Sequence, residues 1–394
     1  MEKPVIRISV RNLVEFILRN GDLESGGTAG DKEAMLKGSR LHRKIQKQMG
    51  SHYQAEVSLK KDTEYEDLIL RVEGRADGIF TQNEKICIDE IKGVYKNLEL
   101  LAEPVLVHRA QALCYAWIYL DDHGLEEIDV QMTYAHLDTE MIKRFRETMT
   151  REELESWYQR LLDSYHKWLS YQMKWREERN RSMEKLEFPF IYRKGQKEMV
   201  AGIYHAISRK EQIFIQAPTG VGKTMSAVFP AVRSIGEGKA ETLFYLTART
   251  ITRTVAQDAF EILRKNGLLF KTVTITAKEK LCFCEKPECN PETCPYAKGH
   301  YDRINDAVYE LWTNEQSFDR ETILRQAEKW QVCPFEMSLE LSVWMDAVIC
   351  DYNYVFDPNV YLKRFFGENI SGKYLFLIDE AHNLVERGRE MYSA

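Results

Sequence analysis

The sequence predicts an α/β protein in which two α/β domains follow one another along 394 residues. Short apolar runs alternate with segments of helical period in both halves of the chain, and this alternation is typical of an α/β fold. A long amphipathic segment at residues 151–184 separates the halves and is expected to form a connecting helix. We therefore expect one domain at residues 1–150 and a second at residues 185–394, which suits about 150 residues per domain.

The composition is ordinary for a globular chain, with 44% hydrophobic and 29% charged residues. No run of about 18 apolar residues is present, so no membrane-spanning helix is predicted. The N-terminus lacks the pattern of a secretory signal, and we expect a cytoplasmic protein. The net charge of −6 argues against a protein that coats nucleic acid through bulk charge, although a local basic groove is compatible with it.

Helices and strands are expected to alternate through the first domain. The periodicity predicts helices at residues 10–20, 33–49 and 108–120, and strands at residues 68–73, 86–91 and 128–137. The polar residues 81–85 lie between the first two strands and are expected to turn the chain into a hairpin.

Three apolar runs of the second domain are expected to be strands. They are residues 213–216, 243–247 and 374–378. The last is continuously apolar, which is typical of a strand buried on both faces of a parallel sheet.

A glycine-rich segment after the first of these runs matches a phosphate-binding loop, with alanine in place of the leading glycine. Glycines let backbone N–H groups surround the phosphates, while Lys223 would reach the β- and γ-phosphates and Thr224 would hold Mg²⁺. The expected nucleotide-binding residues are Ala217, Pro218, Thr219, Gly220, Val221, Gly222, Lys223 and Thr224.

Two carboxylates, Asp379 and Glu380, follow the last apolar run. Asp379 is expected to bind Mg²⁺ through water, and Glu380 is expected to polarise the attacking water. Together with the loop, the pair predicts hydrolysis of a nucleoside triphosphate, with ATP and Mg²⁺ as cofactors.

With His382, these carboxylates form an Asp-Glu-Ala-His box, and the second domain resembles the superfamily 2 helicases that carry it. Residues 351–354 (Asp-Tyr-Asn-Tyr) resemble a segment of the XPD/DinG branch. The resemblance implies a RecA-like ATP-binding domain and 5′ to 3′ movement along DNA. It also implies that Arg193 and Gln196 lie where such helicases read adenine, and that Thr247 and Arg249 contact the DNA backbone.

Five cysteines gather between the loop and the box. Without a secretion signal, clustered thiols are expected to be metal or cluster ligands, and the spacing alone suits either an iron–sulfur cube or a zinc ion. Helicases of the DinG/XPD type carry a [4Fe–4S] domain at this place. The resemblance implies an insertion at about residues 279–336 that holds the cluster through Cys282, Cys289, Cys294 and Cys333, with Cys284 able to replace Cys282 or Cys289.

The hairpin of the first domain carries a second group of reactive side chains. It is expected to bring Asp77 and Glu90 together at its mouth, with Lys92 nearby. Two carboxylates hold a divalent metal ion, and a lysine stabilises the attacking hydroxide or the pentavalent phosphate. This spacing also arises by chance, and ordinary charges at strand ends are the alternative.

Further residues extend the pattern. His42 precedes the hairpin, and Gln111 and Tyr115 lie one turn apart on a helix after it. The order resembles the RecB-like branch of the PD-(D/E)xK nucleases, although Ala76 replaces the proline of that motif. The resemblance implies that Gln111 and Tyr115 orient the lysine or the DNA, and that Mg²⁺ or Mn²⁺ binds His42, Asp77 and Glu90.

A basic segment surrounds His42. It contains Lys37, Arg40, Arg43, Lys44 and Lys47, which form either a solvated face or a contact with a DNA backbone.

The two resemblances together imply a 5′ to 3′ ATP-dependent DNA helicase fused to a metal-dependent nuclease, acting on single-stranded or junction DNA in repair or processing. The sequence ends twelve residues after His382, before any second RecA-like domain. We therefore expect an N-terminal fragment that binds ATP weakly and is poor in ATP hydrolysis and unwinding, because an arginine finger is missing. The alternatives are a non-catalytic DNA-binding module and a stand-alone nuclease regulated by nucleotide.

Overall fold

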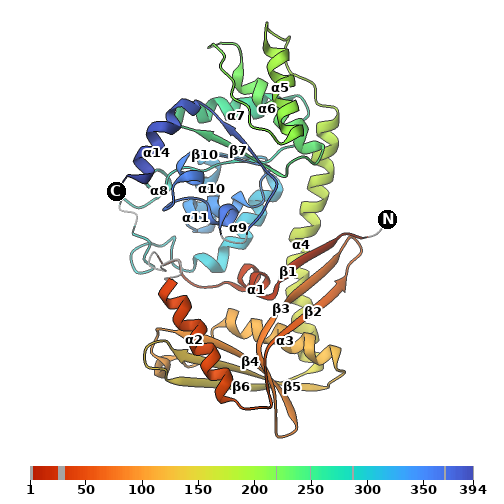
Figure 1. Cartoon of the computed structure of the whole chain (residues 1–394), viewed down its shortest axis with the longest axis vertical. Coiled ribbons are helices and arrows are strands. Elements are labelled where there is room, and N and C mark those ends of the chain that lie inside the picture. Colours follow the sequence, from red (N-terminus) through yellow and green to blue (C-terminus); the bar gives the residue numbers. More distant parts are fainter. Residues whose placement is uncertain are drawn as a thin grey trace. The chain divides into compact units, whose positions relative to one another are not determined.

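The computed structural model describes residues 3–24, 32–218, 220–248, 250–285, 288–367 and 370–393. The chain divides into two compact units, Met1–Ser170 and Tyr171–Ala394 (Figure 1). The division falls within helix α4, Arg151–Glu184, which covers the segment expected to connect the domains. None of the helices in the described ranges is long and apolar enough to cross a membrane.

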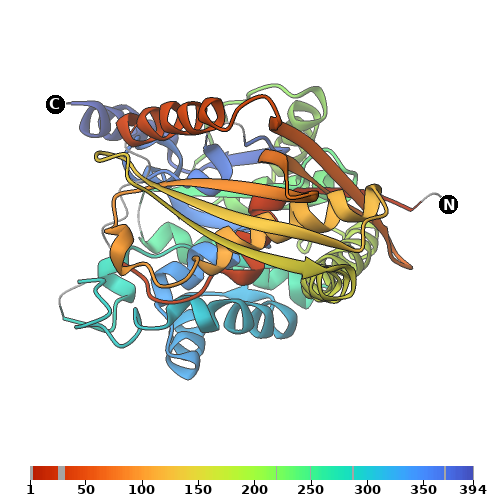
Figure 2. The same ribbon diagram turned by 90° about the horizontal axis from the view of Figure 1, so that it is seen from below.

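Unit 1 contains a mixed sheet of order β1-β3-β4-β5-β6, with β2 paired to β3. Its strands are β1 (Val5–Ser9), β2 (Tyr53–Glu64), β3 (Ile69–Gln82), β4 (Lys85–Val94), β5 (Glu127–His136) and β6 (Ile142–Thr150). Its helices are α1 (Val10–Leu18), α2 (Lys32–Gln48), the short η1 (Leu98–Leu100), α3 (Leu106–Asp122) and the first part of α4. Figure 2 shows this twisted sheet from below, with α2 alongside.

The predicted hairpin is confirmed as β3 and β4, which pair in antiparallel fashion. Asn83 and Glu84 form its turn with φ angles of 52° and 65°, the left-handed conformation that matches the twist of a two-residue hairpin. The predicted helices at residues 10–20, 33–49 and 108–120 are confirmed as α1, α2 and α3.

Three strands of unit 1, β1, β2 and β6, were not predicted. In β2 and β6 the exposed positions include lysine, arginine, aspartate and glutamate, and the buried positions are few. Charged residues on half-exposed strands protect a sheet from unwanted pairing, and they also hide the apolar alternation by which a strand is recognised in a sequence.

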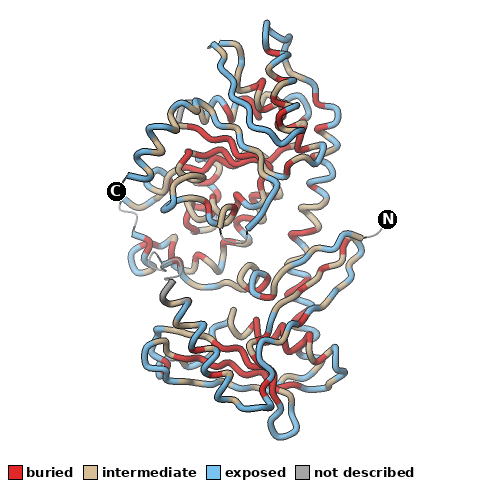
Figure 3. Tube along the Cα trace, in the orientation of Figure 1, coloured by how far each residue is buried: buried red, intermediate tan, exposed pale blue. Residues whose placement is uncertain are grey.

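Helix α3 fixes the core of unit 1. It is buried on nearly all sides, because it packs against α1 and against β4 and β5. The tube coloured by burial shows this core between the exposed edges of the unit (Figure 3). A helix held in this way presents its few polar side chains at fixed positions.

Unit 2 contains a parallel sheet of order β11-β7-β10-β8-β9, and this parallel arrangement confirms the predicted fold class of the second domain. Its strands are β7 (Thr242–Thr247), β8 (Thr272–Thr274), β9 (Ser317–Phe318), β10 (Ala347–Asp351) and β11 (Tyr374–Ile378). Its helices are α5 (Gln196–Arg209), α6 (Lys223–Gly236), α7 (Thr250–Lys265), α8 (Lys278–Leu281), α9 (His300–Asn314), α10 (Arg320–Trp330), α11 (Pro334–Ser342), α12 (Asn353–Phe356), α13 (Lys363–Phe366), η2 (Ala381–Asn383) and α14 (Leu384–Tyr392), together with the last part of α4.

The prediction of a strand at residues 213–216 is wrong. Within the described residues 211–218 no strand forms, and Phe214 is 88% exposed. A strand needs a neighbour that pairs its N–H and C=O groups, and this segment pairs with none of the strands of the sheet.

The order of the strands also corrects the expectation that residues 374–378 are buried on both faces of the sheet. They form β11 as predicted, but among the described residues β11 pairs with β7 alone and therefore lies at the edge of the sheet. Phe376 and Ile378 are 39% and 36% exposed, so this strand is not buried on both faces. The most buried strands lie inside the sheet: all of β8 is buried, and β7 and β10 are buried except for one end residue each.

Candidate active sites

The hairpin of unit 1 opens into a fork. The paired residues of β3 and β4 end at Gly78 and Asp89, while β3 continues beside β2 and β4 continues beside β5. The next residues along, Asp77 and Glu90, therefore lie where the two strands separate. A fork leaves backbone groups without ladder partners, and these groups are available to side chains.

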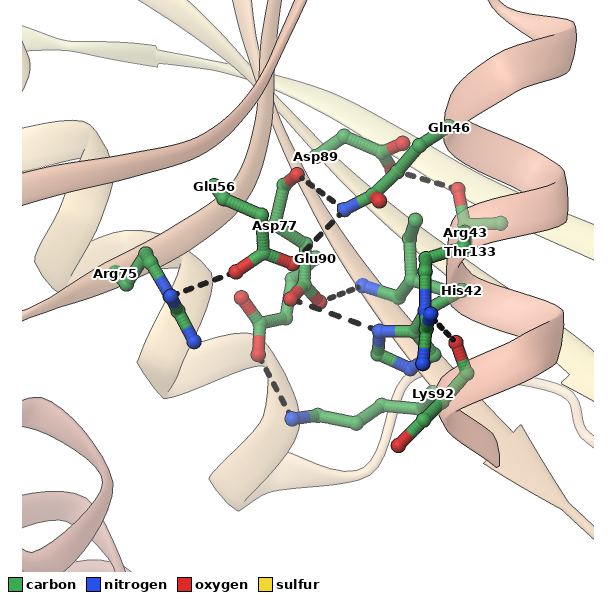
Figure 4. Close-up of polar contacts among 12 residues, drawn as sticks. His42, Arg43, Gln46, Glu56, Arg75, Asp77, Asp89, Glu90, Lys92 and Thr133 are labelled. Atoms are coloured by element: carbon green, nitrogen blue, oxygen red, sulfur yellow. Dashed lines mark hydrogen bonds and ion pairs between the residues drawn. The ribbon is translucent and has the colours of Figure 1, made fainter. Parts of the chain in front are cut away.

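The Asp77 side chain binds one of these unpaired backbone groups. Its Oδ2 accepts a hydrogen bond of 2.7 Å from the backbone N–H of Ile91, which replaces the missing ladder bond. Its Oδ1 lies 3.7 Å from His42 Nδ1 (Figure 4). The Asp77 carboxylate is thus fixed in position, with one oxygen directed toward the imidazole.

His42 lies on helix α2, and burial of the apolar face of this helix fixes the direction of its polar side chains. Leu41 and Ile45 pack against residues of β4 and β5. His42 and Gln46, each one position further along the helix, then turn toward the fork, and Gln46 Nε2 donates a hydrogen bond of 2.9 Å to the carbonyl of Asp77. Two side chains on one face of α2 therefore contact Asp77: His42 lies near its carboxylate, and Gln46 binds its backbone carbonyl.

Glu90 is buried in the fork, with its side chain 5% exposed. Its Oε1 accepts a hydrogen bond of 2.7 Å from Lys92 Nζ, but its Oε2 has no hydrogen-bond partner among the described residues. Burial raises the pKa of Glu90 to about 7, against the attraction of Lys92, and the nearby charge of Asp77 adds to the increase. A buried carboxylate oxygen without a partner is costly unless a cation neutralises it.

Lys92 is held from two sides. Besides Glu90, its ammonium group donates a hydrogen bond of 2.7 Å to Oε1 of Gln111, which is itself buried on α3. Tyr115, one turn along α3, reaches β3 instead, where a side chain at Gly74 would lie 2.7 Å from its hydroxyl. The structure therefore joins Gln111 to the lysine and Tyr115 to the strand that carries Asp77.

The predicted metal ligands come near one another without forming a closed site. In the described ranges, no group of three histidine, cysteine, aspartate or glutamate side chains is arranged to hold a metal ion. The donors themselves suit Mg²⁺ or Mn²⁺, which bind carboxylate oxygens and, for Mn²⁺, also imidazole. The unpartnered Oε2 of Glu90 is the observation that fits a cation in the fork.

Two polar features near the fork were not among the predicted site residues. Glu56, opposite Asp77 on β2, has a left-handed φ of 58°, and its carboxylate pairs with Arg75 at 2.6 Å and accepts from Gln46 at 3.1 Å. Such a conformation costs a residue with a side chain about 1–3 kcal/mol and is concentrated at functional sites. A sequence contains no signal for a left-handed glutamate.

The second feature lies on the other face of β4. Asp89 is fully buried and accepts hydrogen bonds from Tyr53 at 3.0 Å, Gln131 at 3.1 Å and Thr133 at 2.6 Å. Burial raises the pKa of Asp89, although these three donors oppose the increase. The network fixes the strand immediately before Glu90.

The phosphate-binding loop of unit 2 is described except for Thr219, which lies outside the described residues. Gly220 and Gly222 have φ angles of 83° and 77°, which residues with side chains rarely adopt. Gly222 is the N-cap of α6, so Lys223 begins the helix and the unpaired N–H groups of its first turn follow the loop. This arrangement favours an anion.

The box carboxylates lie near this loop. Lys223 Nζ is 3.9 Å from Glu380 Oε1. The hydroxyl of Tyr245 links the side chains of Thr224 and Asp379, and burial and the charge of Glu380 raise the pKa of Asp379. The two groups predicted to hold Mg²⁺ are thus joined through one tyrosine.

The other residues of unit 2 in the predicted helicase motifs are Arg193, Gln196, Thr247, Arg249 and His382. Arg193 donates a hydrogen bond to the carbonyl of Gly220, and the buried Gln196 accepts one of 2.9 Å from the Arg193 backbone. Thr247 is fully buried at the end of β7, and His382 lies 3.5 Å from Glu380. Arg249 lies outside the described residues.

We expect Gly222→Ala to weaken nucleotide binding at least tenfold, as titration with a fluorescent ATP analogue would measure. A Cβ at Gly222 would lie 2.6 Å from Gln196 Nε2, in addition to the cost of its left-handed backbone of about 1 kcal/mol. Gly238→Ala is the matched control, because Gly238 has a φ of 73° but open space around it. Equal affinities of the two variants would contradict this role of Gly222.

The five clustered cysteines lie around α8, α9 and α11. Cys282 follows α8 and Cys333 caps α11, while Cys289, Cys294 and Cys333 are buried. The sulfur atoms of Cys284 and Cys294 are 3.8 Å apart. Lys286 and Pro287, between the second and third cysteines, lie outside the described residues. A set of thiolates suits an iron–sulfur cluster and zinc alike.

Family comparisons match the second half of the chain. The family model of the DEAD/DEAH box helicases matches residues 193–288, and the model DEAD_2 matches residues 265–394. These matches cover the phosphate-binding loop, the cysteines and the box. Residues 193–394 are therefore similar to superfamily 2 helicases of the XPD/DinG type, in agreement with the motifs.

Curated relatives agree. The Regulator of telomere elongation helicase 1 homolog of Caenorhabditis briggsae is 23% identical over 247 residues, which cover 52% of this chain and 24% of that protein. The Fanconi anemia group J protein homolog of Gallus gallus is 32% identical over 103 residues, which cover 26% of this chain and 8% of that protein. A solved structure titled XPD_Helicase covers 49% of this chain and 33% of its own, with 18% identity and a TM-score of 0.32. The match to the telomere helicase homolog thus spans about a quarter of that protein's length.

Proposed function

We propose that unit 2 is the ATP-binding domain of a DNA helicase of the XPD/DinG type, and that unit 1 is a metal-dependent nuclease attached to it. The observation that carries the first part is the meeting of the loop and the box, where Lys223 approaches Glu380 and Tyr245 links Thr224 to Asp379. The family matches over residues 193–394 support the same conclusion.

The chemistry of unit 2 follows from these positions. Backbone N–H groups at the start of α6 and the Lys223 ammonium would bind the phosphates, and Thr224 and Asp379 would hold Mg²⁺. Glu380 would orient the attacking water. An arginine finger stabilises the charge of the transition state in enzymes of this kind, so turnover depends on more than the nucleotide-binding residues.

Binding of an ATP analogue therefore tests unit 2 more directly than turnover does. We expect Mg²⁺-dependent binding that Lys223→Ala weakens by about 2–3 kcal/mol, because it removes a charged hydrogen-bond donor to the phosphates. Lys239→Ala, which removes a half-buried lysine that pairs with Glu237 away from the loop, is the matched control. Affinity for the analogue that is the same in all three proteins would exclude a nucleotide site in this loop.

The second part of the proposal rests on the fork of unit 1. Asp77 and Glu90 would hold a divalent cation, which supplies a hydroxide nucleophile and a Lewis acid when it is bound. His42 lies beside Asp77 as a further donor, and Lys92 is held next to Glu90, where its ammonium would stabilise charge on the phosphate. Gln111 keeps that ammonium in place.

Cleavage of end-labelled single-stranded DNA with Mg²⁺, with Mn²⁺ and with chelator tests this part, since cleavage does not depend on unit 2.

The same proposal includes a role in DNA repair or processing, DNA single strands or junctions as substrates, and a [4Fe–4S] cluster bound by the cysteines. The candidate functions that compete with it are a non-catalytic DNA-binding module and a nuclease regulated by nucleotide. The first predicts DNA binding without cleavage, and the second predicts cleavage that changes when an ATP analogue is added.

A further inference from the structure

Helix α2 has a third face that neither the core nor the fork uses. Leu41 and Ile45 are buried, and His42 and Gln46 reach toward Asp77. The remaining side chains at three- and four-residue spacing are exposed and form a stripe that lines a hollow of about 320 Å³, with Arg40, Arg43, Lys44 and Lys47 as its described lining.

The stripe carries charge that the protein does not neutralise. Residues 36–48 contain no aspartate or glutamate, although the whole chain has a net charge of −6. Lys44 pairs with Glu140, whereas Arg40, Arg43 and Lys47 have no carboxylate within ion-pair distance in the part of the chain that the structure describes. Three cations that share one helix face at this spacing repel one another unless an anion lies between them.

We propose that this stripe binds the phosphate backbone of the DNA strand that enters the fork. The proposal rests on the proposed nuclease function of unit 1 and adds the residues that would hold its substrate. The stripe from Arg40 to Lys47 rises about 10 Å along the helix, which matches about three phosphates at 3.4 Å per nucleotide of a stacked strand.

The position of the stripe relative to the fork supports this assignment. Arg43 follows His42 and Lys47 follows Gln46, so each of these two cations lies about 100° around the helix from a side chain that faces Asp77. A strand bound along the stripe would therefore lie on the side of α2 next to the face that His42 and Gln46 turn toward Asp77. Phosphate contacts of this kind set the position of a strand without reading its sequence.

The test compares two variants with the same change in charge. Arg40→Gln/Arg43→Gln/Lys47→Gln removes the three cations of the stripe that have no ion pair and keeps Lys44, and Arg7→Gln/Lys60→Gln/Arg160→Gln removes two arginines and one lysine from other exposed positions of unit 1. Both are made in the full chain and on a Lys92→Ala background, so that the DNA remains intact. The probe is a fluorescent oligothymidylate, and its dissociation constant is measured by anisotropy at several salt concentrations.

We expect the stripe variant to bind roughly tenfold more weakly at low salt and the control to bind like the parent. Each phosphate contact on a single strand contributes about 0.7 to the slope of log affinity against log salt, so the stripe variant should lose about 2 from that slope. Because unit 2 is also proposed to bind DNA, cross-linking of an iodouracil-substituted probe locates the contact. Cross-links within residues 40–48 are expected in the control and not in the stripe variant.

The outcomes separate this proposal from the nuclease proposal. Unchanged affinity, slope and cross-links in the stripe variant would overturn the stripe as a DNA site, even if the parent chain cleaves DNA. Loss of binding in the stripe variant, together with a parent chain that cleaves no DNA with either metal, would keep the stripe and overturn the nuclease. Thermal unfolding of both variants confirms that exposed substitutions leave the fold intact.

Discussion

Lys92→Ala is expected to lower the rate of metal-dependent DNA cleavage about 100- to 1,000-fold, the loss that follows removal of one preorganised donor from a charged transition state. The Lys92 ammonium lies 2.7 Å from both Glu90 Oε1 and Gln111 Oε1, so its position does not depend on the substrate. A charge that is fixed before the reaction stabilises developing charge on the phosphate without any cost of reorganisation.

The control for this variant is Lys85→Ala. Lys85 lies on the same strand, β4, but is exposed and pairs with Glu127 at 2.8 Å. Its removal takes away the same charge from the same strand and should leave the cleavage rate within about twofold, as is usual for surface substitutions away from a site. End-labelled single-stranded DNA, with initial rates measured in Mg²⁺ and in Mn²⁺, gives the comparison.

Asp77→Ala and Gln111→Ala divide the roles further. Asp77→Ala removes a proposed metal ligand, and its defect should become smaller as the Mn²⁺ concentration rises. Gln111→Ala removes only the group that holds the ammonium, so it should lower the rate less than Lys92→Ala does, with the same dependence on metal. If Lys92→Ala cleaves DNA as fast as Lys85→Ala, the fork is not the active site.

Much of this fork could be predicted from the sequence, because its parts depend on local patterns. Two apolar runs around a polar turn predicted the hairpin, and the separation of Asp77 from Glu90 then followed from the turn at Asn83 and Glu84. The positions of His42 and Gln111 depend on two helices that are distant from the hairpin in the sequence. The packing of α2 and α3 in unit 1 fixes the direction of these two side chains.

What could not be predicted depends on partners distant in the sequence. The run at residues 213–216 has the composition of a strand, yet it finds no neighbour to pair with, and β11 is left at the edge of the sheet. The left-handed Glu56 was equally hidden, because its conformation depends on Gln46 and Arg75, which hold its carboxylate from two other elements. Propensity alone carries no information about such contacts.

A second large effect is expected in unit 2, where the last part of α4 is anchored by one buried carboxylate. Asp346 precedes β10 and accepts hydrogen bonds from Trp175 Nε1 at 2.9 Å, Arg179 Nη1 at 2.5 Å and the Lys271 backbone at 2.8 Å. The side chains of Arg179 and Asp346 are only 7% and 5% exposed. An ion pair without access to water is costly to break, because the partner that remains keeps a buried charge.

We therefore expect Arg179→Ala to destabilise unit 2 by about 3–5 kcal/mol, toward the lower limit because Trp175 and Lys271 still donate to Asp346. Arg181→Ala is the matched control, since Arg181 pairs with Glu177 on the same helix while both side chains are largely exposed, and such pairs contribute under about 1 kcal/mol. Amide hydrogen exchange of β7 and β10 measures the change within unit 2 itself.

The double variant Arg179→Met/Asp346→Leu decides what the ion pair does. Replacing both charges by apolar groups removes the buried charge that Arg179→Ala leaves behind, so it should recover much of the lost protection if that charge is the cause. If the double variant is no more stable than Arg179→Ala, the main contribution of Asp346 is its hydrogen bonds to Trp175 and to the Lys271 backbone, which fix α4 and the start of β8 in either case. Protection in Arg179→Ala equal to that in Arg181→Ala would show that the carboxylate does not anchor the helix.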